Sequence, residues 1–135
     1  MKLITTYLIG ILVILLMSAT SCNKEEAGCF TSTGNVVTEE RHADTIRRIE
    51  LHDNVNLFLT VDSTRNSIRV EAGENLIPGI ITSYSKKSLI IQNTNRCDWV
   101  RDFTTPVNVY VTASHLDSIE YRSSGDIISQ NTWTR

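Results

Sequence analysis

Hydrophobic and polar residues alternate along most of this 135-residue chain after residue 34. Between residues 55 and 61, for example, Val, Leu, Leu and Val alternate with Asn, Phe and Thr. A period of two is typical of a β-strand with one buried face. The same reasoning predicts strands at 35–39, 46–51, 55–61, 68–72, 80–84, 88–92, 107–113, 116–121 and 127–128.

No segment after residue 34 carries the stripe of an amphipathic helix, so the pattern predicts an all-β domain. Leu76-Ile77-Pro78 is expected to form only a short helical turn or bend, because a proline disfavours helix at the residue before it. Strands recur roughly every ten residues, which suits a sandwich, a barrel or a solenoid. Asp117-Ser118-Ile119 and Gly125-Asp126-Ile127 each place a turn residue before an aliphatic one, a repetition that stacked coils would show.

The N-terminal segment has the pattern of a secretory signal. Lys2 precedes an apolar run, residues 8–17, which is shorter than the roughly 20 residues needed to span a bilayer. Small residues follow the run, as they do before a cleavage site. The alternative is a membrane anchor that is not cleaved.

Residues 19–22, Ala-Thr-Ser-Cys, resemble the bacterial lipobox, which implies cleavage before Cys22 and lipid modification of its thiol. Lys24-Glu25-Glu26 resembles the export tag of surface lipoproteins in the Bacteroidetes, although a charged linker is the simpler interpretation. We therefore expect a signal peptide at 1–21, a tether at 22–28 and a domain at 29–135. The protein is expected in the cell envelope, held to the outer membrane by its lipid and exposed at the surface.

Two cysteines remain once Cys22 carries lipid. Cys29 and Cys97 lie in a compartment where disulfides persist, and we expect them to pair. Two separate thiols, or a bridge to another chain, are the alternatives. No Cys/His cluster has zinc-ligand spacing, so no metal site is predicted.

The formal net charge of −2, without basic clusters in the sequence, argues against nucleic-acid binding. No nucleophile elbow or phosphate-binding loop is present, so neither a catalytic residue nor a cofactor is predicted. The polar stretch 93–105 holds Trp99 and Arg101, which are the candidates for ligand contact. Asp98 and Asp102 flank them, and an acid pair of this kind would suit a polysaccharide-acting enzyme, which is the alternative function.

Five segments together resemble one family. They are CFTSTGNVVTEER (29–41), VNLFLT (55–60), VEAGENLIP (70–78), VNVYV (107–111) and SIEYRSSGDI (118–127). These strings are similar to the head GIN domain family of Bacteroidetes lipoproteins, described as autotransporter adhesins. The resemblance implies a right-handed parallel β-solenoid (β-helix-like), here incomplete at its C-terminus, with a β-sandwich as the alternative.

The resemblance implies no established reaction. We therefore expect a surface-anchored binding module, or an adhesin-like structural protein of the envelope, without catalytic activity. The expected partners are the membrane, through the lipid anchor, and a glycan or protein ligand; nucleic acid is not expected.

Overall fold

The computed structural model describes residues 32–95 and 105–132, and this part of the chain is almost entirely β-structure. The elements are β1 (Val36–Arg41), β2 (Arg48–Asp53), β3 (Asn56–Val61), β4 (Ser67–Gly73), the 3-10 turn η2 (Ile77–Gly79), β5 (Ile80–Ser85), β6 (Ser88–Asn93), β7 (Asn108–Ala113), β8 (Ser118–Ser123) and β9 (Ile127–Ser129). The all-β prediction is confirmed. Each predicted strand is present within two residues of its expected bounds, and η2 lies at the expected bend.

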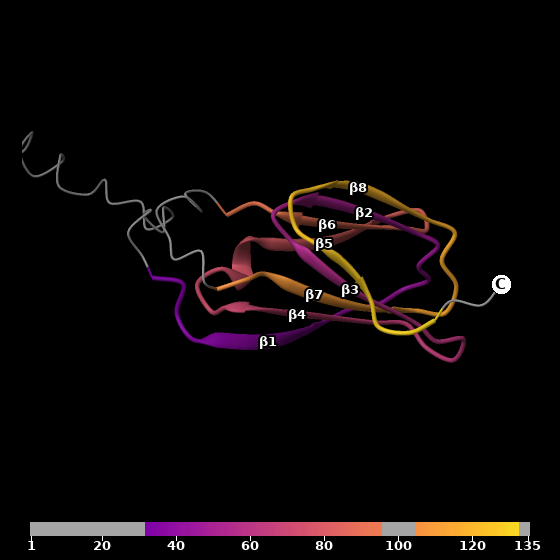
Figure 1. The fold of residues 1–135 in the computed structure, drawn as a ribbon, viewed down its shortest axis with the longest axis horizontal. Coiled ribbons are helices and arrows are strands. Elements are labelled where there is room, and N and C mark those ends of the chain that lie inside the picture. Colours follow the sequence, from indigo (N-terminus) through magenta and orange to yellow (C-terminus); the bar gives the residue numbers. More distant parts are fainter. Residues whose placement is uncertain (1–31, 96–104, 133–135) are drawn as a thin grey trace, which may run out of the picture.

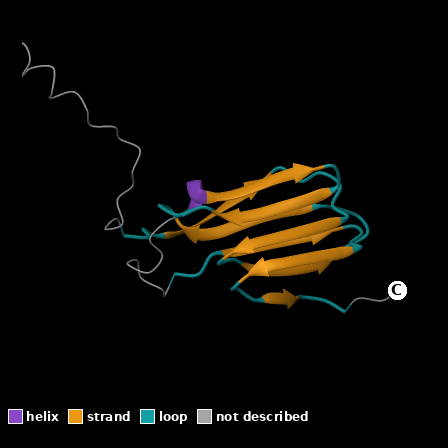
Figure 2. Ribbon diagram, turned by 90° about the horizontal axis from the view of Figure 1, so that it is seen from above, coloured by secondary structure: helices purple, strands orange, loops and turns teal. Residues whose placement is uncertain are grey.

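The strands form two sheets that pack as a sandwich (Figure 1). One sheet, called sheet A, has the order β1-β4-β7-β3-β9, and the other, sheet B, has the order β5-β6-β2-β8. Figure 2, seen from above, shows the strands lying alongside one another, with η2 at one end of the stack.

The expectation of a right-handed parallel β-solenoid is wrong, and the sandwich alternative fits the structure. Both sheets are mixed: β1 with β4, β4 with β7 and β5 with β6 run antiparallel, whereas β2 and β3 have parallel neighbours on both sides. The two-residue turn Lys86-Lys87 explains part of this difference, because so short a connection can only return the chain antiparallel to the preceding strand. Alternation along a strand reports which face is buried and carries no information on strand direction.

The core lies between the sheets and is aliphatic. Its members with no exposed surface include Ile49 and Leu51 of β2, Leu57 and Leu59 of β3, and Ile91 of β6. Burying a side chain of this size stabilises a fold by about 1.5–3 kcal/mol relative to leaving it exposed. The central strands of both sheets therefore hold the sandwich together.

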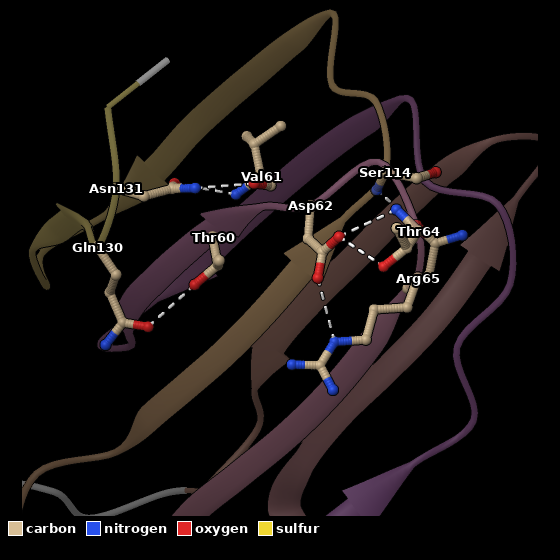
Figure 3. Close-up of polar contacts among 9 residues, drawn as sticks. Thr60, Val61, Asp62, Thr64, Arg65, Ser114, Gln130 and Asn131 are labelled. Carbon is tan, nitrogen blue, oxygen red and sulfur yellow. Dashed lines mark hydrogen bonds and ion pairs between the residues drawn. The ribbon is translucent and has the colours of Figure 1, made fainter. Parts of the chain in front are cut away.

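Segment 117–131 pairs with segment 47–61 along its length, and each residue lies beside the one whose number is lower by 70. Asp126 donates its backbone N–H to the Asn56 side chain at 3.0 Å, and the Leu57 N–H bonds the Asp126 carbonyl at 2.8 Å. At the far end, Asn131 bonds both backbone groups of Val61, as Figure 3 shows. The same strand–turn–strand shape is thus formed twice and paired along its length.

Candidate functional site

The residues chosen from the sequence as sites lie outside the described part of the chain. They are Cys22, Cys29, Cys97, Trp99 and Arg101, together with the acid pair Asp98 and Asp102. Lipidation, the disulfide and the ligand contacts therefore remain predictions. In the part of the chain that is described, no helix is long and apolar enough to cross a membrane.

The structure instead offers an open groove on the outer face of sheet B, where β2, β6 and β8 begin and β5 ends. Its volume is about 410 Å³, within the range of small-ligand sites. Its lining residues are Arg47, Arg48, Glu50, Ser85, Lys86, Lys87, Ser88, Asp117 and Ser118. We call this feature the basic groove, because four cations and two carboxylates line it.

Backbone hydrogen bonds fix the three chain segments that form the groove. Arg47 and Arg48 donate their backbone N–H groups to the Lys87 carbonyl at 2.9 and 3.2 Å. Asp117 donates its own to the Arg47 carbonyl at 2.8 Å. Lys86 takes a positive φ of 59° in the turn between β5 and β6, a backbone conformation that tight hairpins require. The charged side chains therefore project from three segments that are joined to one another by backbone hydrogen bonds.

One cation of the groove is neutralised by a direct partner. The Arg47 guanidinium donates to both carboxylate oxygens of Asp117, from Nε at 2.8 Å and from Nη2 at 3.2 Å. This hydrogen bond holds the pKa of the Asp117 carboxyl below its ordinary value, and His115, 3.1 Å away, acts in the same direction. Both members of the pair are about half exposed, so the ion pair orients the side chains more than it stabilises the fold.

The other three cations have no carboxylate partner within residues 32–95 and 105–132. Arg48 donates from Nε to the Ser118 hydroxyl at 3.3 Å, which leaves its terminal nitrogens available. Lys86 and Lys87 are exposed. The second carboxylate, Glu50, accepts a hydrogen bond from the Ser88 hydroxyl at 2.8 Å. The arrangement can attract and orient an anion.

This groove corrects the expectation that basic residues do not cluster. The sequence signal is the pair of dipeptides Arg47-Arg48 and Lys86-Lys87. The first lies in the predicted strand 46–51, and the second lies between the predicted strands 80–84 and 88–92. The structure brings them together because Arg48 pairs with Ser88 in the parallel ladder of β2 and β6. A pairing across 40 residues of sequence cannot be inferred from alternation alone.

A second polar surface covers the outer face of sheet A. Phe58 and Tyr110 stack with ring centroids 4.7 Å apart, and the Arg69 guanidinium lies 4.4 Å from the centre of the Tyr110 ring. Partial burial, followed by the nearby Glu71 carboxylate, raises the pKa of the Tyr110 hydroxyl. Asn108 also donates to Glu71, at 3.0 Å. These groups bond one another, so the surface is a closed network that offers few free donors to a ligand.

The carboxylate of Asp62 stabilises the turn between β3 and β4. Asp62 accepts hydrogen bonds from the backbone and hydroxyl of Thr64 at 3.0 and 2.7 Å, and pairs with Arg65 at 3.4 Å (Figure 3). The Thr64 hydrogen bonds lower the pKa of the Asp62 carboxyl. Within the described ranges, no group of three or more His, Cys, Asp or Glu residues is placed to hold a metal ion.

Comparison with known families identifies the class to which the chain belongs. Residues 46–134 match the model of a family described as "Putative auto-transporter adhesin, head GIN domain". The match spans more than half of the chain, so the protein belongs to this family, as the sequence resemblance predicted. No curated protein matches the chain.

Solved structures share the fold at low sequence identity. An adhesin from Bacteroides fragilis, described as putative, is 13% identical with a TM-score of 0.63, over 72% of this chain and 44% of its own. A similarly described adhesin from Parabacteroides distasonis is 13% identical with a TM-score of 0.61, over 73% of this chain and 42% of its own. A "Putative lipid binding protein" from the same species is 16% identical with a TM-score of 0.58, over 73% and 43%. The chain thus spans less than half the length of these structures, and the likeness establishes the fold alone.

Proposed function

We propose that this protein is a binding module of the bacterial cell envelope that acts by adhesion and carries out no reaction. The observation that carries the proposal is the basic groove, in which exposed cations project from a fixed sheet. Family membership supports it, since the family is described by adhesion. Both carboxylates that line the groove already have partners, Asp117 in Arg47 and Glu50 in Ser88, which fits recognition better than catalysis.

Anchoring through Cys22 would place the domain on the outer membrane, with residues 22–28 as the tether. The lipobox-like residues 19–22 support this part of the proposal, and so does the bacterial origin of the structural neighbours, three of which are described as adhesins. Several acyl chains on one cysteine give a stable anchor, because each buried CH₂ contributes about 0.8 kcal/mol.

A disulfide between Cys29 and Cys97 would close the end of the sandwich near η2. Described residues close to each cysteine support this pairing. The Asn75 side chain donates to the Ser32 carbonyl at 2.9 Å. The carbonyl of Leu76, the residue after Asn75, accepts a hydrogen bond from the Asn95 side chain at 2.9 Å. Ser32 lies just after Cys29 in the sequence, and Asn95 lies just before Cys97. Both residues contact the bend that precedes η2. Trp99 and Arg101 would then lie beside the bridge as additional ligand contacts.

The proposal is tested by locating the full chain in cells of a Bacteroidetes host. We expect the wild type in the outer-membrane fraction, and we expect protease added to intact cells to degrade it. A Cys22→Ala variant should leave that fraction, because it cannot accept lipid. Equal distribution of the wild type and the variant in the soluble fraction would contradict the proposed anchoring.

A further inference from the structure

The basic groove has a charge opposite to that of the chain that carries it. The whole protein has a formal net charge of −2, whereas four cations face two carboxylates in the groove. One of the carboxylates, Asp117, is occupied by Arg47, and the other, Glu50, by the Ser88 hydroxyl. The groove is positively charged, whereas the whole protein is slightly negative. The groove can therefore attract anions locally, while the rest of the surface does not attract polyanions.

The floor of the groove is made of small hydroxyl-bearing side chains. In the ladders of sheet B, Arg48 pairs with Ser88 on one side and Ser118 on the other, and Ser88 pairs in turn with Ser85. Three serines and one arginine therefore form a continuous row across the four strands. Serines leave space above the sheet, and their hydroxyls both donate and accept hydrogen bonds.

Cations above a hydroxyl-lined floor match the chemistry of an acidic sugar. Arg48, Lys86 and Lys87 supply donors for a carboxylate or sulfate, and the serine row supplies partners for neighbouring sugar hydroxyls. No aromatic side chain lines the groove, so it lacks the stacking surface on which single-stranded nucleic acids depend. The groove is open at the surface, so it can hold one sugar unit in the middle of a polysaccharide while the rest of the polysaccharide extends out on both sides.

From these observations we propose that the basic groove binds the acidic groups of an anionic polysaccharide. The inference rests on the proposed adhesive function and names its ligand class. Lys86 and Lys87 pair with the carboxylate or sulfate, Arg48 contacts it from the sheet, and the three serines bond the adjoining hydroxyls. Arg47 is a positioning residue, because its guanidinium is already held by Asp117.

The test measures binding of the detergent-solubilised full chain to three oligosaccharides: oligogalacturonate, which is carboxylated, a heparin oligosaccharide, which is sulfated, and neutral maltooligosaccharide. We expect binding to at least one acidic sugar and none to the neutral sugar. Binding should weaken roughly tenfold in Lys86→Ser/Lys87→Ser, because charge-assisted hydrogen bonds are lost, and it should also weaken with added salt.

The matched control is Arg65→Ser/Arg122→Ser, which also removes two positive charges but alters no residue of the groove. This variant should bind like the wild type. Equal weakening in both double variants, or no binding of either acidic sugar, would overturn the inference. Binding of the neutral sugar alone would also overturn it and would leave the proposed adhesive function intact, whereas that function fails separately if the wild type never reaches the envelope.

Discussion

Gly125 is a residue at which segment 117–131 lies close to the backbone of segment 47–61. A Cβ atom added to Gly125 would lie 2.1 Å from the Val55 carbonyl oxygen and 2.9 Å from the Asn56 backbone nitrogen. Neither contact can be relieved by rotating a side chain, because both atoms belong to the backbone. Only glycine therefore fits between these two turns.

Replacing Gly125 with alanine should destabilise the fold. We expect the free energy of unfolding to fall by about 1–3 kcal/mol, the usual cost of overpacking, as measured by urea denaturation. Ser124→Ala is the control, since this neighbouring side chain is exposed. An alanine variant at Gly125 as stable as the wild type would contradict the close packing of the two turns.

The Arg47–Asp117 pair gives a pH-dependent contribution to stability. Because Arg47 lowers the pKa of Asp117 in the folded state, the pair stabilises the protein fully above the ordinary carboxyl value of 3.8. That contribution is lost as the pH falls through the lowered folded value. The effect should be small, since Asp117 is half exposed.

The measurement compares denaturation midpoints of the wild type and Asp117→Asn from pH 7 to pH 2. The wild type should be the more stable at neutral pH, and the difference should vanish at the acid end. Asp126→Asn, which removes a charge of the same sign near β9, is the control for the loss of one negative charge. A gap between the wild type and Asp117→Asn that stays constant with pH would refute the role of the pair.

At the scale of residues, the sequence predicts burial well and the site poorly. Leu57, Leu59 and their alternating neighbours on β3 are apolar, and the structure buries the expected face. Lys86 and Lys87 are equally visible in the sequence, but their meaning depends on Arg47 and Arg48, which approach them only through sheet pairing. Residues that meet only through the pairing of parallel strands are far apart in the sequence, so they form no short sequence motif.

Strand β3 lies inside sheet A, and β9 beside it forms an exposed edge. β3 pairs on one side with β7 and on the other with β9, and two of its side chains have no exposed surface. All three residues of β9 are exposed. An edge strand with so little burial has few contacts to hold it closed.

Hydrogen exchange should separate these two strands. We expect the amides of β3 and β7 to be among the slowest to exchange, and those of Ile127–Ser129 to exchange at least tenfold faster, because local opening needs less free energy where burial is low. The comparison is internal to one mass-spectrometry experiment. Equal protection of β9 and β3 would show that the edge is held by contacts other than those described.

The elements themselves could be predicted from sequence, but their partners could not. Alternation located every strand, and Pro78 located η2. The order β1-β4-β7-β3-β9 joins strands that lie far apart in the chain, and β4 runs antiparallel to β7 while β3 runs parallel to it. The repeated turns at 117–119 and 125–127 suggested stacked coils, but antiparallel strands in both sheets make the fold a mixed sandwich.

The whole molecule would gain stability from a bridge between Cys29 and Cys97. Chain-entropy arguments give about 4 kcal/mol for closing so long a loop. Cys29→Ser/Cys97→Ser should therefore lower the unfolding free energy by a similar amount, and unreduced peptide mapping of the wild type should show the linked pair. Free thiols at both positions in the oxidised protein would contradict the pairing.

In the proposed function, the domain, the tether and the anchor form an adhesive unit whose contact surface is the basic groove. Each part can be removed by a separate substitution: Cys22→Ala removes the anchor, and Lys86→Ser/Lys87→Ser removes the exposed lysines of the groove. The Arg65→Ser/Arg122→Ser variant keeps both.

The most direct test measures retention of cells on a surface coated with acidic polysaccharide. Cells that display the wild type or Arg65→Ser/Arg122→Ser should be retained. Cells that carry Lys86→Ser/Lys87→Ser should be retained less well than the wild type, and cells that carry Cys22→Ala should be released at the rate of cells without the protein. Equal retention of all these cells, or equal retention of wild-type cells on a neutral glycan, would contradict the account.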